Sequence, residues 1–387
     1  MLILITGKSD NIVMAGIYIH IPFCRQACHY CDFHFSVKQE YKTATVAAIV
    51  KEMELQQHYL GNELIHTIYL GGGTPSLLNQ YELNSIFEKM YQRFDIDSNA
   101  EITLEANPDD LTIEKIAELA QLPVNRLSIG IQSFDDADLK WMNRAHNAKQ
   151  ATHSVHAAQA AGFDNISIDL MYGLPESNEE MWEQNISKAL ELNVNHISCY
   201  CLTVEPKTAL AHFILSGKSK PIHEEQSARQ FEVLMKKMKE QDWKHYEISN
   251  FSSDDLHCSK HNTAYWQGKK YLGLGPSAHS FNGVSRQWNV SNNHQYMETI
   301  NNGKTGFEKE ILTPTQQINE RIMTQLRTMW GLKLTDFAAP AADLIRDSSR
   351  EFITAGFASL ENNSLILTDS GKLIADKIIV DLMLEED

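Results

Sequence analysis

The chain has 387 residues, of which 43% are hydrophobic and 22% charged, a composition typical of a folded, water-soluble protein. Its 50 acidic residues outnumber its 34 basic ones, which gives a formal net charge of −16. Such a surface repels phosphate backbones and anionic lipid, so we expect no nucleic-acid partner and no direct membrane anchor. The sequence also lacks an apolar run of ~18 residues and a signal-peptide pattern, and we therefore expect a cytoplasmic protein.

We predict that residues 1–13 form an N-terminal leader, because Met14 lies directly before the first strand pattern. From there to about residue 250, short β-rich runs alternate with helical patterns whose apolar residues recur every three or four positions. Repeated βα units predict an α/β fold, a partial (β/α)6 TIM-like barrel over residues 14–250. The predicted strands are 17–21, 67–70, 102–105, 126–131, 165–172 and 196–204.

Three cysteines, Cys24, Cys28 and Cys31, lie within eight residues just after the first predicted strand. Thiolates at C-x3-C-x2-C spacing on one loop are suited to three irons of a [4Fe–4S] cluster. The fourth iron is then free to bind the amine and carboxylate of an exogenous ligand. Cys199, Cys201 and Cys258 show no ligand-like spacing, and we interpret them as small buried apolar residues.

A structural zinc site is the alternative interpretation of these cysteines. Zinc sites of this kind need four protein ligands, and His29 or His34 is available as the fourth. The position of the motif at the start of a βα barrel favours the iron–sulfur cluster.

Further polar or glycine-rich segments follow the later predicted strands, where functional groups of parallel βα folds gather. Gly71–Gly72–Gly73 precedes Thr74 and lets a ligand approach the backbone closely, although a tight turn is the alternative explanation. Carboxylates at such positions suit hydroxyl and amine groups, and an arginine suits a carboxylate. The polar residues at later strand ends are Glu105, Gln132, Arg144 and Asp169.

Residues 251–310 form a connecting segment that contains the sequence HNTAYW, beginning at His261. A histidine flanked by aromatic residues is suited to bind haem iron, while the alternative is a buried histidine held by hydrogen bonds. Residues 311–387 predict a C-terminal α+β domain that resembles a winged helix. Because that domain has 7 basic and 12 acidic residues, we do not expect it to bind DNA.

Several segments together resemble the oxygen-independent coproporphyrinogen oxidase family of radical S-adenosylmethionine (SAM) proteins. The resemblance runs from about Tyr18 into the C-terminal domain and is similar in detail to the branch of HemW haem chaperones. The segments are YIHIPFCRQACHYCDF, GGGTPS, TLEANPDDL, RLSIGIQSF, ISIDLMYGLPE, HYEISNF and HNTAYW with YLGLGPSAHS.

Two departures from the oxidases favour the chaperone branch. The oxidases have a further cysteine at the position of Phe33, and they have a long arm before the cluster, whereas 23 residues precede Cys24 here. The resemblance thus implies a protein that binds haem and delivers it to haemoproteins such as membrane-bound respiratory enzymes. A homodimer is compatible with this function. The alternative function is oxidative decarboxylation of coproporphyrinogen III by a 5′-deoxyadenosyl radical in porphyrin biosynthesis.

The resemblance also assigns ligands to three groups: a [4Fe–4S] cluster, SAM and haem. It implies Cys24, Cys28 and Cys31 for the cluster and His261 for haem iron, and it assigns no catalytic side chain. The SAM contacts that it implies are Tyr18, Tyr30, Gly72, Gly73, Thr74, Glu105, Gln132, Arg144 and Asp169.

Overall fold

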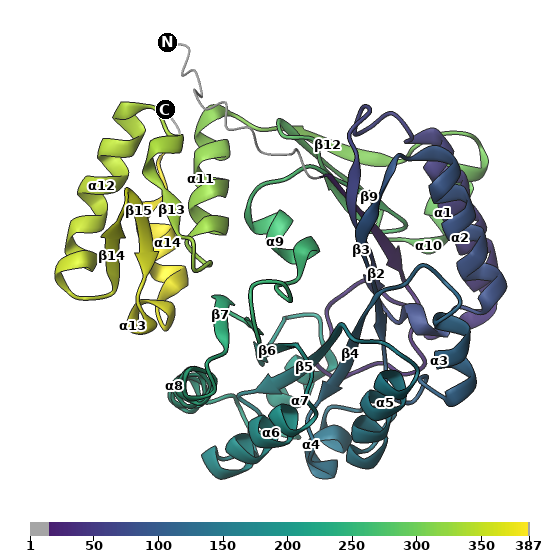
Figure 1. Cartoon of the computed structure of the whole chain (residues 1–387), viewed down its shortest axis with the longest axis horizontal. Coiled ribbons are helices and arrows are strands. Elements are labelled where there is room, and N and C mark those ends of the chain that lie inside the picture. The colour runs from purple at the N-terminus through teal and green to yellow at the C-terminus, as the bar shows by residue number, and fades with distance from the viewer. Residues whose placement is uncertain (1–14, 386–387) are drawn as a thin grey trace.

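A curved sheet of twelve strands dominates the computed structural model, which describes residues 15–385 (Figure 1). Strands β1 to β6 are parallel and pair in the order of the sequence, which confirms the predicted α/β fold. The predicted leader, residues 1–13, lies outside the described residues. The parallel strands are β1 (Ala15–Ile21), β2 (Ile65–Gly72), β3 (Ile96–Ala106), β4 (Arg126–Gln132), β5 (Ile166–Tyr172) and β6 (His196–Cys201).

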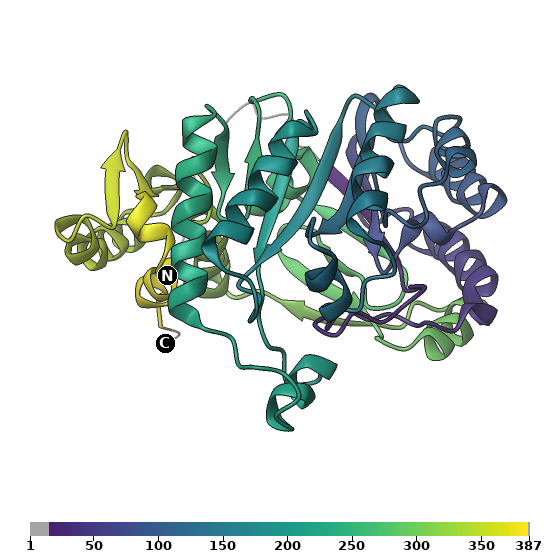
Figure 2. The same cartoon turned by 90° about the horizontal axis from the view of Figure 1, so that it is seen from below.

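Helices between these strands cover the outer face of the sheet (Figures 1 and 2). The strands are apolar over most of their length and buried on both faces, as expected when helices and the barrel interior cover a parallel sheet. None of the helices in residues 15–385 is long and apolar enough to cross a membrane. These outer helices are α1 (Lys42–Leu55), α2 (Gln80–Arg93), α3 (Ile113–Leu119), α4 (Asp136–Trp141), α5 (Ala148–Ala160), α6 (Glu179–Glu191) and α8 (Glu224–Glu240). Helix α7 (Ala209–Leu215) instead stands away from the sheet (Figure 2), and its Leu210 N–H donates to the His29 carbonyl oxygen at 2.8 Å.

The connecting segment is more regular than its composition predicts. Strand β9 pairs in parallel with β1, and three antiparallel strands extend the sheet beyond it. Helix α9 (Lys260–Trp266) contacts β1, β2 and the later helix α11 (Pro314–Gln325), on the concave side of the sheet (Figure 1). The elements are α9 (Lys260–Trp266), β9 (Tyr271–Leu274), β10 (His279–Phe281), β11 (Ser285–Asn289), α10 (Asn293–Asn301) and β12 (Phe307–Ile311). The strands have three to five residues each, too short for a clear alternation of apolar and polar residues.

At the other edge of the sheet, a short hairpin follows the sixth parallel strand. Strands β7 (Lys244–Glu247) and β8 (Asn250–Ser252) are antiparallel, and β8 pairs with β6. Strand β6 ends at Cys201, three residues before the predicted boundary at 204. The prediction that all three remaining cysteines are buried is wrong for Cys201, which lies exposed at that strand end.

The C-terminal elements stand to one side of the barrel in both views (Figures 1 and 2) and enclose a smaller hydrophobic cluster that is separate from the main core. It is built on a three-stranded antiparallel sheet covered by helices. Helix α11 begins with Thr313 as N-cap and Pro314 in its first turn. The elements are α11 (Pro314–Gln325), β13 (Leu332–Lys333), α12 (Ala339–Thr354), β14 (Ala358–Glu361), β15 (Ser364–Leu367), α13 (Asp369–Lys372) and α14 (Ala375–Leu382).

A buried carboxylate joins the first helix to the added edge of the sheet. Glu52 on α1 is fully buried, and its oxygens accept hydrogen bonds from the Tyr296 hydroxyl at 2.6 Å, the Asn289 amide at 2.7 Å and the Gly275 N–H at 2.8 Å. These donors come from α10, β11 and the loop after β9. Glu52 therefore fixes the β9–β11 edge against the helical layer.

Replacing Glu52 by Ala should lower the free energy of unfolding by at least about 3 kcal/mol, because three buried donors lose their acceptor. Glu54 on the same helix is a matched control, because it forms partly exposed ion pairs with Lys89 and Arg93. Its replacement by Ala should cost far less stability, because solvent screens exposed ion pairs. Chemical denaturation of both variants measures the difference, and equal losses would contradict this role of Glu52.

Candidate functional site

The three clustered cysteines lie on the loop between β1 and α1, at the carboxyl ends of the parallel strands. All three are partly exposed. Two sulfurs have polar neighbours from other loops: the Thr74 hydroxyl lies 3.6 Å from Cys24 Sγ, and an Arg144 terminal nitrogen lies 3.4 Å from Cys28 Sγ. The loop thus presents soft sulfur ligands beside a fixed positive charge.

Burial raises the pKa of the Cys24 thiol to about 11 and that of Cys31 to about 12. Without a metal, both thiols therefore remain protonated at neutral pH. A metal cluster would displace these protons, as thiolate ligands require. The donor set fits a [4Fe–4S] group, in which each thiolate binds a different iron.

The zinc interpretation requires ligands that converge on one ion. His29 donates from Nδ1 to the Trp141 carbonyl oxygen at 2.8 Å, and His34 Nε2 is 2.6 Å from the Asn293 side-chain oxygen. Within residues 15–385, no three His, Cys, Asp or Glu side chains are arranged to hold a single metal ion. Neither histidine is therefore grouped with the cysteines as a fourth zinc ligand in the described part of the chain.

The glycine-rich loop after β2 packs directly against the cysteine loop. Gly73 donates its N–H to the Ile21 carbonyl oxygen at 2.9 Å, and a Cβ at Gly73 would lie 2.6 Å from that oxygen. Gly72 has a φ of 103°, and a Cβ there would lie 2.3 Å from the His20 ring. The glycines are therefore required by close packing of the two loops, in addition to any access that they give to a ligand.

Two carboxylates, Glu105 on β3 and Asp169 on β5, lie on either side of β4 and are close enough to interact electrostatically. Glu105 accepts hydrogen bonds from the Tyr69 hydroxyl at 2.8 Å and the Gly72 N–H at 3.1 Å. Burial raises the pKa of Glu105 to about 7 and that of Asp169 to about 6. Perturbed carboxylates in a concave site are typical of ligand-binding positions.

Arg144 connects the polar groups at the carboxyl ends of the parallel strands, which we call the rim of the barrel. Its main partner, Asn107, is not among the residues predicted from the sequence. The Arg144 guanidinium donates to the Asn107 side-chain oxygen at 2.6 Å and to the Gly130 carbonyl at 2.7 Å. The Asn107 amide in turn donates to the Thr74 hydroxyl at 3.0 Å. A continuous path of hydrogen bonds therefore joins Cys24 to Cys28. Asn107 belongs to the segment EANP at a strand end, the one sequence signal that pointed to it.

The remaining predicted SAM contacts lie around the same strand ends. The Tyr18 hydroxyl is 3.1 Å from His20 Nδ1. Tyr30 belongs to the cysteine loop itself and packs against a small hydrophobic cluster that includes Leu139 and Met142. Gln132 ends β4 with a φ of 67°, an uncommon conformation for a residue other than glycine. Backbone strain of this kind is often retained at functional sites.

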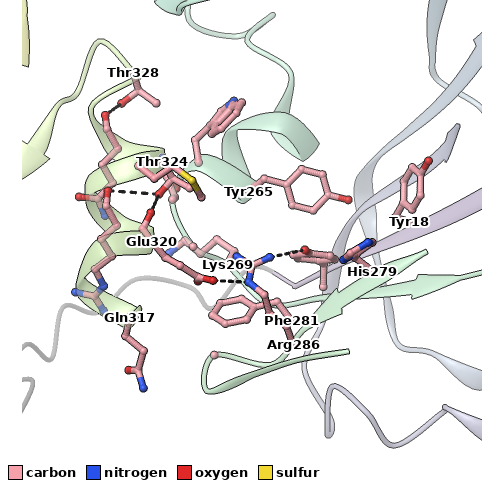
Figure 3. A pocket seen from close by; sticks show the side chains of 18 of the residues that line it. Tyr18, Tyr265, Lys269, His279, Phe281, Arg286, Gln317, Glu320, Thr324 and Thr328 are labelled. Carbon is pink, nitrogen blue, oxygen red and sulfur yellow. Dashed lines mark hydrogen bonds and ion pairs between the residues drawn. The ribbon is translucent and has the colours of Figure 1, made fainter. Parts of the chain in front are cut away.

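A large cleft begins at this rim and extends to the C-terminal domain. It has a volume of about 1700 Å³ and includes Tyr18 and His20 at one end. Asp32 and Phe33, the two residues after the last clustered cysteine, also line it. In Figure 3 the side chains of α11 face those of β10 and β11 across the cavity. The cleft exceeds the ~300–1,000 Å³ of ordinary small-molecule pockets and reaches the cysteine loop.

The predicted haem ligand, His261, lies behind the wall of this cleft. Its side chain is 1% exposed, and it does not line the cavity. Nδ1 is hydrogen-bonded to the Thr67 hydroxyl and Nε2 to the Tyr265 hydroxyl, each at 2.8 Å. Both nitrogens are thus occupied, and burial lowers the pKa of His261 to about 3. This geometry supports the alternative of a hydrogen-bonded core histidine; iron ligation by His261 requires one of its ring nitrogens to give up its present partner and become accessible.

Replacing Asn107 by Ala should weaken SAM binding about tenfold, because Arg144 and Thr74 both lose a partner. The cysteines remain, so iron and sulfide content after anaerobic reconstitution should stay close to wild type. Asn107→Asp keeps the acceptor for Arg144 and should lose less affinity. Equilibrium dialysis with labelled SAM measures both variants, and wild-type affinity in Asn107→Ala would contradict the assigned role.

Comparison with known proteins agrees with this arrangement. Residues 18–189 match the radical SAM superfamily, and residues 312–374 match the HemN C-terminal domain. The heme chaperone HemW of Bacillus subtilis is 34% identical, with 94% of this chain and 98% of that protein covered. The heme chaperone HemW of Lactococcus lactis is 31% identical, with 95% and 97% covered. The solved structure of coproporphyrinogen III oxidase from Escherichia coli covers 95% of this chain and 90% of its own, with a TM-score of 0.82 at 20% identity, and so shares the fold. Since its similarity to the HemW proteins extends over almost the whole of both chains, this protein belongs to the HemW family of radical SAM proteins.

Proposed function

We propose that this protein is a haem chaperone, which binds haem as cargo and delivers it to recipient haemoproteins, respiratory enzymes of the membrane among them. The observation that carries the proposal is the continuity of the large cleft with the cysteine loop, through Asp32 and Phe33. The cleft has space for a tetrapyrrole, and its rim adjoins the expected cluster. The full-length similarity to HemW chaperones supports the same function.

In this proposal Cys24, Cys28 and Cys31 hold a [4Fe–4S] cluster, and the strand ends around it hold SAM. Glu105 and Asp169 are placed to accept hydrogen bonds from hydroxyl or amine groups. Arg144 supplies a positive charge for a carboxylate, in a position fixed by Asn107 and Gly130. A bound cluster would supply one electron for reductive cleavage of SAM.

The side chain at position 33 bears on the alternative function, coproporphyrinogen oxidation. Phe33 is 67% exposed and lines the cleft, where the oxidases have a further cysteine. An aromatic side chain there offers a surface for a flat apolar ligand and no thiol. The position therefore favours cargo binding.

A paired assay on one anaerobically reconstituted preparation tests the proposal. Haemin titration should give saturable, stoichiometric binding, while incubation with SAM, a reductant and coproporphyrinogen III should give no protoporphyrinogen. Replacing the three clustered cysteines by Ala should remove the brown colour and SAM binding, because the cluster loses its ligands. Turnover of coproporphyrinogen without haemin binding would replace the chaperone function by the oxidase.

A further inference from the structure

Two buried polar atoms face each other beside Arg144, and neither has a hydrogen-bond partner among residues 15–385. They are Oδ1 of Asp109, in the loop after β3, and Nδ1 of His146, in the loop between α4 and α5. The two atoms lie 3.9 Å apart, which is too far for a direct hydrogen bond. Because buried polar atoms are as a rule hydrogen-bonded, we expect a donor from outside the chain between them.

The hydrogen bond on the other side of His146 shows that its Nδ1 is an acceptor. Nε2 lies 3.0 Å from the Ile131 carbonyl oxygen, which can only accept, so Nε2 carries the proton. Burial and the charge of Arg144 lower the pKa of His146 to about 4, which keeps the ring neutral at physiological pH. Nδ1 therefore has a lone pair and no proton, and it cannot donate to Asp109.

Arg144 supplies the third polar group at this position. Its terminal nitrogens are already bonded within the site, whereas its Nε–H is buried and has no partner in the described part of the chain. The Arg144 charge acts on both Asp109 and His146. One donor and two acceptors match a single water molecule, and buried waters have about three such partners. A cation between the two acceptors would be repelled by the guanidinium.

Both acceptors are fixed by other parts of the rim. Oδ2 of Asp109 lies 3.4 Å from Nε of Arg25, which directly follows the first clustered cysteine. Arg25 also pairs with Asp110, whose carboxylate accepts a hydrogen bond from the Ser76 hydroxyl at 2.9 Å. His146 is held by the backbone of β4. A water at this position would therefore join the cysteine loop, the loop after β3 and the end of β4.

We propose that one ordered water bridges Asp109, His146 and Arg144, and that Asp109 and His146 are positioning residues that hold the Arg144 guanidinium for the carboxylate of SAM. The inference rests on the proposed SAM site, because Arg144 is the group that meets the ligand there. A hydrogen bond to Nε–H stops rotation of the planar guanidinium, and so fixes the direction of its remaining donors. Asp109 and His146 act on SAM through the water and Arg144.

Two substitutions of His146 separate the nitrogen that faces the water from the one bonded to Ile131. His146→Asn keeps an amide oxygen near the position of Nδ1, whereas His146→Gln keeps a donor for Ile131 and loses the acceptor for the water. Equilibrium dialysis of SAM with anaerobically reconstituted full-length protein measures both. Affinity should fall about tenfold in His146→Gln and stay within about twofold of wild type in His146→Asn. Equal affinities, or the reverse order that a bond to Ile131 alone would give, would overturn the positioning role.

A crystal structure that resolves ordered water tests the bridge without SAM. Water within hydrogen-bond distance of Asp109 Oδ1, His146 Nδ1 and Arg144 Nε is expected in the wild type, and its loss is expected in His146→Gln. A wild-type structure without this water would overturn the inference and leave the SAM site standing. If the water is present and the wild type binds no SAM, the proposed SAM site fails and the positioning role fails with it.

The control variant for both measurements is His153→Ala. His153 is an exposed histidine on α5, so this variant should match wild type in SAM affinity and keep the water. Thermal melting of each variant establishes that it is folded.

Discussion

The Arg144 guanidinium is the interaction on which the site depends. Arg144 lies after strand β4, and its guanidinium contacts Cys28 in the cysteine loop, Asn107 in the loop after β3 and the Gly130 carbonyl oxygen in β4. A guanidinium presents its donors in a fixed, planar arrangement, so these contacts set distances as well as charge. Asn107 also donates a hydrogen bond to Thr74, whose hydroxyl contacts Cys24. The loops after β1, β2, β3 and β4 are therefore held in fixed positions relative to one another.

The same rim opens into a cleft that two parts of the chain build together. One wall comes from β10, β11 and α9, at the edge of the sheet beside β1, and the other comes from α11 and the C-terminal domain. Glu52 and the Glu101–His261–Tyr265 path hold the first wall against the helical layer and the barrel interior. A ligand between these walls would contact both the barrel and the added domain, and would lie within reach of the cysteine loop.

This arrangement gives the two histidine-containing segments different tasks. HNTAYW forms a helix whose histidine is buried, and its aromatic residues face the cleft. The segment YLGLGPSAHS instead places an exposed histidine, His279, at the start of strand β10. A histidine that has both ring nitrogens in hydrogen bonds stabilises a wall, whereas one with free nitrogens is available for chemistry.

The sequence by itself determined the repeated βα units, the parallel sheet and the grouping of polar residues at strand ends, because these features depend on local periodicity and on motifs of adjacent residues. Cys24, Cys28 and Cys31 were recognisable for the same reason, since their spacing is short. Tertiary structure alone decided that Asn107 links Thr74 to Arg144, that β9 joins β1, and that His261 is enclosed while His279 is exposed. Those facts depend on contacts between residues far apart in the chain, and no local pattern encodes which ring nitrogen meets a hydroxyl and which remains free.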